Sequence, residues 1–161
     1  MQNRGLKYLN YDVVFQEVPD EVTLAFNVTN CPYTCDECHS PYLRDNIGNY
    51  LCNDMGSILD RHKDMITCVC FMGGDQDRES LIYLLGIVKQ TYELKTCLYT
   101  GTDDIDDLDD VIKYLDYIKV GAYRKELGGL NSQKTNQRFY KISGKTLSDL
   151  TYSFQNKNEV I

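Results

Sequence analysis

The chain of 161 residues contains no hydrophobic run long enough to cross a membrane, and its first 20 residues place charges between short apolar groups. A signal peptide needs an uninterrupted apolar segment there, so these absences predict a cytoplasmic protein without a membrane partner. Positive charge is scarce too, because 17 Lys and Arg residues stand against 24 Asp and Glu residues, for a net charge of -7. Such a chain gains little from neutralising phosphates, and we expect no nucleic-acid partner.

Internal repeats and linker-like stretches are also missing. With 42% hydrophobic residues, the chain can bury one sizeable core, but it is too short for two domains of ordinary size. We therefore expect a single domain over residues 1–161, with its core at roughly residues 11–142 and a frayed C-terminal end from about Gln155.

Cysteine, in contrast, is plentiful. Seven cysteines is an odd number for a disulfide framework, and no export signal accompanies them, so a reducing compartment fits better. Three of them follow the spacing C-x3-C-x2-C within eight residues: Cys31, Cys35 and Cys38. The others lie inside predicted strands or just before a predicted helix and are interpreted as small buried residues: Cys52, Cys68, Cys70 and Cys97.

Strand-like and helix-like patterns alternate along the chain. Runs rich in β-formers predict strands at residues 21–28, 66–72, 96–99, 117–123 and 137–142. Asn53 can cap a helix with the stripe Met55, Ile58, Leu59 and His62, and a second helix has the stripe Leu81, Leu84, Leu85 and Val88. The acidic run at residues 103–110 lacks the glycine and the final glutamate of an EF-hand loop, and is interpreted as the solvated face of a third helix with the stripe Ile105, Leu108, Ile112 and Leu115.

This alternation predicts an α/β fold with mostly parallel strands and right-handed crossovers. A closed eight-unit barrel needs about 250 residues. The prediction is therefore a partial (βα) barrel that is open on one side, which would let a large substrate reach its interior.

The three clustered cysteines can wrap one loop around a compact metal centre. A cubane iron-sulfur cluster normally takes four ligands, so three thiolates would leave one iron open for chemistry. Ferredoxins use a different spacing. Structural zinc, with His39 or His62 as fourth ligand, is the alternative, although a residue adjacent to a ligand is badly placed to complete the same tetrahedron.

The loop CPYTCDECH resembles the radical S-adenosylmethionine enzymes, whose signature is this three-cysteine spacing. Within that superfamily the chain is similar to the activating proteins of anaerobic ribonucleoside-triphosphate reductase, over about residues 11–142. The likeness includes MGGD at residues 72–75, YTG at residues 99–101 and TNQRF at residues 135–139, in the same order.

The resemblance implies a 4Fe-4S cluster on Cys31, Cys35 and Cys38, and a barrel of the radical S-adenosylmethionine type. It implies S-adenosylmethionine contacts from Cys38 and its neighbours Glu37 and His39 on the adenine side. Around the methionine end, it implies contacts from Gly73, Gly74 and Asp75, where glycine lets the ligand approach the backbone closely. No catalytic residue is expected beyond the cluster.

The implied reaction is the reductive cleavage of S-adenosylmethionine to methionine and a 5'-deoxyadenosyl radical. That radical would take a hydrogen atom from a glycine on the large subunit of the reductase, with flavodoxin or ferredoxin as electron donor. Alternatives are an activator of another glycyl-radical enzyme, a small-molecule radical enzyme, and, outside catalysis, a zinc-binding or iron-sulfur adaptor.

Overall fold

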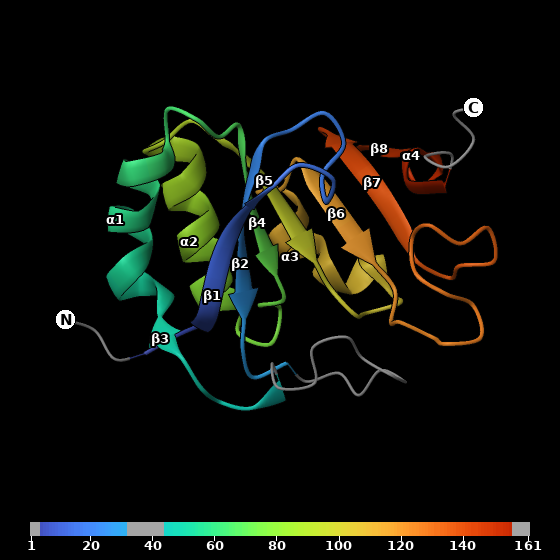
Figure 1. Ribbon diagram of the computed structural model, residues 1–161, viewed down its shortest axis with the longest axis horizontal. Coiled ribbons are helices and arrows are strands. Elements are labelled where there is room, and N and C mark those ends of the chain that lie inside the picture. The colour runs from blue at the N-terminus through green and yellow to red at the C-terminus, as the bar shows by residue number, and fades with distance from the viewer. Residues whose placement is uncertain (1–3, 32–43, 156–161) are drawn as a thin grey trace.

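The computed structural model describes residues 4–31 and 44–155 (Figure 1). One eight-stranded sheet organises the chain, in the spatial order β3-β1-β2-β4-β5-β6-β7-β8. The strands are β1(Lys7–Val14), β2(Thr23–Val28), β3(Asn49–Tyr50), β4(Cys68–Met72), β5(Lys95–Tyr99), β6(Tyr117–Val120), β7(Arg138–Ser143) and β8(Thr146–Asp149). The helices are α1(Leu51–His62), α2(Arg78–Gln90), the 3-10 helix η2(Ile105–Leu108), α3(Asp109–Ile112) and α4(Tyr152–Gln155).

The sheet is mixed, so the predicted parallel barrel is wrong. β2, β4, β5 and β6 pair in parallel, but the other four pairings, β3 with β1, β1 with β2, β6 with β7 and β7 with β8, are antiparallel. Helices connect the parallel strands, whereas residues 121–137, all of them described, contain no helix before β7. A parallel pair needs a long crossover, and without a crossover helix β7 returns antiparallel to β6.

Two strands were not predicted because their sequences show no clear strand pattern: β1, which lies between β3 and β2, and the edge strand β8. In β1 the sequence KYLNYDVV places Asn10 and Asp12 among apolar residues, and all four residues of β8 are exposed. β8 follows β7 through a two-residue turn in which Gly144 has φ 60°, as a type II′ hairpin requires of its first central residue.

The predicted start of the first helix is also wrong. α1 begins at Leu51, directly after β3, and its N-cap position is Tyr50 rather than Asn53. The Leu51 N–H donates to the Leu6 carbonyl at 2.9 Å, so a backbone bond to the segment before β1 takes the place of a side-chain cap. Cys52 consequently lies inside the helix rather than before it.

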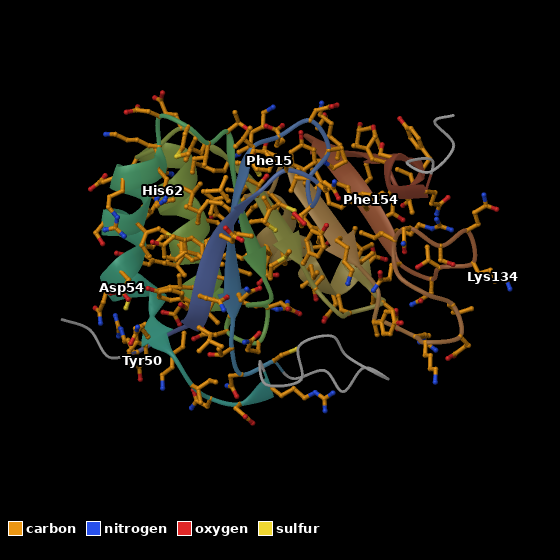
Figure 2. The ribbon with its side chains drawn as sticks, in the orientation of Figure 1. Phe15, Tyr50, Asp54, His62, Lys134 and Phe154 are labelled. Atoms are coloured by element: carbon orange, nitrogen blue, oxygen red, sulfur yellow. The ribbon has the colours of Figure 1, made fainter. Side chains whose placement is uncertain are left out.

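The sheet separates two hydrophobic cores. Helices α1, α2 and α3 pack on one face, over Phe26, Phe71 and Leu98 of the central strands. On the other face a smaller core gathers Cys70, Cys97 and Phe139 with residues of loops and of α4. There the ring of Phe154 in α4 lies 5.1 Å from that of Phe139, centroid to centroid (Figure 2).

The four parallel strands end at one edge of the sheet, at the bottom of Figure 1. Loops that leave the carboxyl ends of parallel strands converge, and ligands of open α/β sheets usually bind there. Among the described helices, none is both long and apolar enough to cross a bilayer.

Candidate functional site

The cysteine loop, which carries Cys31, Cys35 and Cys38, follows the carboxyl end of β2. Hydrogen bonds join the segments at its two ends, residues 29–30 and 45–47, which we call the neck. The Thr29 N–H donates to the Lys7 carbonyl at 2.9 Å, and its hydroxyl donates to the Ile47 carbonyl at 2.6 Å. The next N–H, from Asn30, donates to the Asp45 carbonyl at 3.0 Å. Because these bonds join residues 29–30 to residues 45–47, the two segments that flank the intervening loop lie side by side.

Cys31, the first predicted ligand, is half-buried directly beyond this neck. Asn30 before it has φ 60°, a left-handed conformation that asparagine tolerates better than most residues. The other predicted residues of the loop, Cys35, Glu37, Cys38 and His39, lie outside the described residues. Within residues 4–31 and 44–155, no group of three His, Cys, Asp or Glu side chains could hold a metal ion.

The glycine turn, residues 73–75, follows β4, the parallel neighbour of β2. Both glycines have positive φ, 102° at Gly73 and 127° at Gly74, which only glycine adopts without strain. A Cβ on Gly74 would also lie 3.1 Å from Leu6 Cδ1 and 3.4 Å from Leu81 Cδ1. Glycine at this turn therefore has a conformational and a steric cause.

The backbone N–H groups of the two glycines in this turn are already used. The Gly73 N–H donates to the Tyr99 carbonyl at 2.9 Å, and the Gly74 N–H donates to the Gln76 side chain at 3.1 Å. A phosphate would need such N–H groups to point at it. An ammonium group donates hydrogen bonds, and the Gly74 carbonyl, which accepts from the Asp77 N–H at 3.2 Å, keeps a second lone pair, so this turn fits an amine better than a phosphate.

Asp75 joins the glycine turn to the end of β5. The Thr100 hydroxyl donates to Asp75 Oδ2 at 2.9 Å, and the Thr100 N–H donates to the Lys119 carbonyl at 2.9 Å. Lys119 Nζ in turn donates to the carbonyls of Thr100 and Gly121, at 3.2 and 2.9 Å. These bonds fix the ends of β4, β5 and β6 relative to one another.

One row of side chains crosses the sheet at this edge, and the sequence patterns did not identify it. Register pairs Asn27 with Met72, Met72 with Tyr99, and Tyr99 with Lys119. Met72 and Tyr99 pack against the smaller core, and Lys119 Nζ lies 5.8 Å from the centre of the Tyr99 ring. In the sequence, the only sign of this row was that a polar or polarisable residue occupies the last position on this face of the sheet in each of the four strands.

Three cysteines outside the loop belong to the smaller core. Cys68, Cys70 and Cys97 are fully buried in β4 and β5, as predicted. Burial raises the pKa of the Cys68 and Cys97 thiols well above their ordinary value of 9.0. Thiols that stay protonated are poor nucleophiles and poor metal ligands, so their role here is packing.

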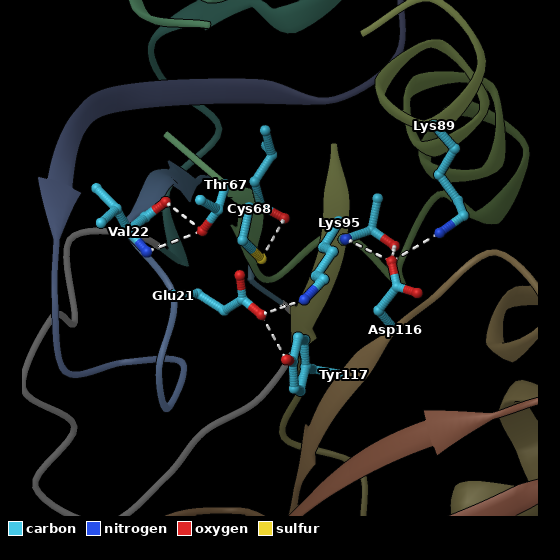
Figure 3. Close-up of polar contacts among 10 residues, drawn as sticks. Glu21, Val22, Thr67, Cys68, Lys89, Lys95, Asp116 and Tyr117 are labelled. Carbon is cyan, nitrogen blue, oxygen red and sulfur yellow. Dashed lines mark hydrogen bonds and ion pairs between the residues drawn. The ribbon is translucent and has the colours of Figure 1, made fainter. Parts of the chain in front are cut away.

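A buried carboxylate lies at the opposite, amino-terminal edge of the parallel strands (Figure 3). Glu21 accepts hydrogen bonds from Lys95 Nζ at 2.8 Å and from the Tyr117 hydroxyl at 2.6 Å, and its side chain is 5% exposed. Burial opposes its ionisation, but the bonds from Lys95, Tyr117 and Thr67 outweigh burial and lower the pKa of Glu21 below 4.5. The cluster joins the start of β2 to β5 and β6 at the edge opposite to Cys31 and the glycine turn, so we interpret it as structural.

Replacing Glu21 by glutamine is expected to lower the free energy of unfolding by about 1–2 kcal/mol at pH 7, because a charge-assisted pair is lost. Since folding lowers the pKa of Glu21, its carboxylate stabilises the fold above the unfolded-state pKa and loses this effect as the pH falls through the folded-state value. Urea unfolding from pH 7 to pH 3 should thus show the difference shrinking below about pH 4.5. The exposed Glu126→Gln is the control, and a difference that is constant with pH would contradict the role of the charge.

Comparisons of this chain with protein-family models, with curated proteins and with solved structures find no match.

Proposed function

We propose that this chain is an activating enzyme that uses a 4Fe-4S cluster and S-adenosylmethionine to generate a glycyl radical on the large subunit of anaerobic ribonucleoside-triphosphate reductase. The observation that carries the proposal is the adjacency of two features. The cysteine loop begins at Cys31 beyond β2, and the glycine turn follows β4, the next strand in the sheet. The proposal requires that the carboxyl ends of β2 and β4 lie side by side, and it does not require a barrel.

The chemistry of the residues fits the two proposed cofactors. Cys31, Cys35 and Cys38 would supply three thiolates, fewer than the four ligands that a cubane cluster normally takes. When bound, the cluster would supply an electron and an open iron for cleaving S-adenosylmethionine. The carbonyls of Gly73 and Gly74 would accept hydrogen bonds from the ligand's ammonium group, whereas Asp75, held by Thr100, would add negative charge beside it.

The residues at the strand ends would bind and orient the ligand rather than move protons. Cleavage followed by hydrogen-atom transfer needs no general base, and we assign none. Lys119 and Tyr99 would line the inner side of the site, Lys119 with its ammonium group held by two backbone carbonyls. An electron donor such as flavodoxin or ferredoxin would have to reach the same edge of the sheet.

The test is anaerobic reconstitution of the full chain with iron and sulfide, followed by reduction and addition of S-adenosylmethionine and the reductase large subunit. We expect about four iron ions per chain, release of 5'-deoxyadenosine, and a glycyl radical signal in the electron paramagnetic resonance spectrum of the large subunit. A colourless protein that retains zinc would overturn the proposal in favour of an adaptor. A cluster that leaves S-adenosylmethionine intact would indicate electron transfer, and cleavage without a radical on the reductase would indicate another substrate.

A further inference from the structure

The Gln76 side chain connects the neck of the cysteine loop to the glycine turn. Its Nε2 donates to the Thr29 carbonyl at 2.9 Å, and its Oε1 accepts from the Gly74 N–H at 3.1 Å. A carbonyl can only accept and a backbone N–H can only donate, so these two partners fix which end of the amide faces which segment. Gln76 therefore joins two backbone groups that lie on separate loops.

This connection lies beyond the point where the sheet holds the two strands together. The register of β2 with β4 ends at the pair Asn27 and Met72. From there the backbone of Gly73 bonds to β5, through the Tyr99 carbonyl, rather than to β2. Gln76 reaches back from the turn to Thr29, two residues before Cys31, and so restores a link between the segments that the strands no longer pair.

We propose that Gln76 is a positioning residue that sets the placement of residues 29–31, where the cysteine loop begins, relative to the glycine turn, and thereby the affinity for S-adenosylmethionine. The inference rests on the function proposed above, in which the ligand spans the loop and the turn. Gln76 is not assigned any contact with the ligand. Its effect would come through the Thr29 carbonyl and the Gly74 amide.

The bonding pattern explains why glutamine suits this position. Glutamate keeps the length but places a carboxylate oxygen against the Thr29 carbonyl, where two acceptors repel. Methionine has a similar volume and flexibility and makes neither bond. Gln76→Met thus removes the link with little change in packing, while Gln76→Glu removes one bond and adds a repulsion.

The first measurement uses the metal-free chain. Amide hydrogen exchange at Gly74 should be faster in Gln76→Met than in the wild type, because the N–H loses its acceptor, and the melting temperature should change little. The matched control is Gln90→Met, the same replacement at an exposed position at the end of α2. Unchanged Gly74 exchange would overturn the inference without involving any cofactor.

The second measurement uses the reconstituted chain. We expect Gln76→Met and Gln76→Glu to bind as much iron as the wild type but to bind S-adenosylmethionine about tenfold more weakly, equivalent to about 1.4 kcal/mol. The change that the ligand causes in the electron paramagnetic resonance spectrum of the reduced cluster should also differ from that of the wild type. A purely structural role would lower the melting temperature and leave the dissociation constant and this spectrum unchanged.

The outcomes separate this inference from the proposed function. If the wild type holds a cluster and binds S-adenosylmethionine, but both Gln76 variants bind it as tightly as the wild type does, the inference fails and the proposed function stands. If the wild type itself holds no cluster or binds no S-adenosylmethionine, the proposed function fails and this inference fails with it. Should Gln76→Met not fold, the dissociation constant of Gln76→Glu decides.

Discussion

Replacing Cys35 by serine is expected to lower the iron content of the reconstituted chain from about four ions to less than one, because two thiolates cannot hold a cubane. Cleavage of S-adenosylmethionine should fall by at least about 100-fold, since even the residues that only orient metal ligands commonly account for 10–100-fold in affinity or activity. Iron and sulfide analysis, the visible absorbance and the yield of 5'-deoxyadenosine measure these effects.

Cys52→Ser is the control for this experiment. Cys52 lies in α1, and its thiol donates to the Arg4 carbonyl at 3.3 Å, a bond that a serine hydroxyl can replace. This variant should keep its iron and its activity. If Cys35→Ser kept both as well, the cysteine loop would not be the cluster site and the proposed function would be wrong.

Replacing Phe26 by alanine is expected to lower the free energy of unfolding by about 3–5 kcal/mol, the usual cost of truncating a buried aromatic residue. Phe26 is fully buried in β2. Its ring stacks on Phe71 at 5.8 Å and meets the edge of Tyr8 at 5.7 Å, centroid to centroid. Domains have a total stability of about 5–15 kcal/mol, so this variant should be close to unfolding at physiological temperature.

Urea unfolding at 25 °C measures the effect of Phe26→Ala, and Phe15→Ala is the matched control. Phe15 is 68% exposed in the loop after β1, so its truncation should change stability by less than about 0.5 kcal/mol (Figure 2). Similar losses for the two variants would mean that the core on the helix side of the sheet does not depend on the Phe26 ring.

Local patterns predicted the central strands and helices well. Of the run ITCVCFM, residues 68–72 became β4, buried on both faces, and the stripe Leu81, Leu84, Leu85 and Val88 became the buried side of α2. The acidic run formed η2 and α3, shorter than the helix we predicted. These elements could be predicted from the sequence because burial on a fixed face requires a periodic hydrophobic pattern.

Strand direction could not be derived in the same way. β6 and β7 show the same hydrophobic content whether they run parallel or antiparallel, and the choice followed from residues 121–137 lacking a crossover helix. β1, which lies between β3 and β2, and the edge strand β8 bury too little for a clear pattern. Our prediction was based on the alternation of strands and helices, and it therefore contained too many parallel strand pairs.

By itself, the sequence determined the cysteine spacing, the glycines of the turn and the order in which they follow strands, because covalent spacing and glycine's backbone freedom are local properties. Only the tertiary structure brought the end of β2 beside the glycine turn, aligned Asn27, Met72, Tyr99 and Lys119 in one row, and joined Thr29 to Gly74 through Gln76. The reason is that strand order and register arise from pairing between residues tens of positions apart, which no local pattern encodes.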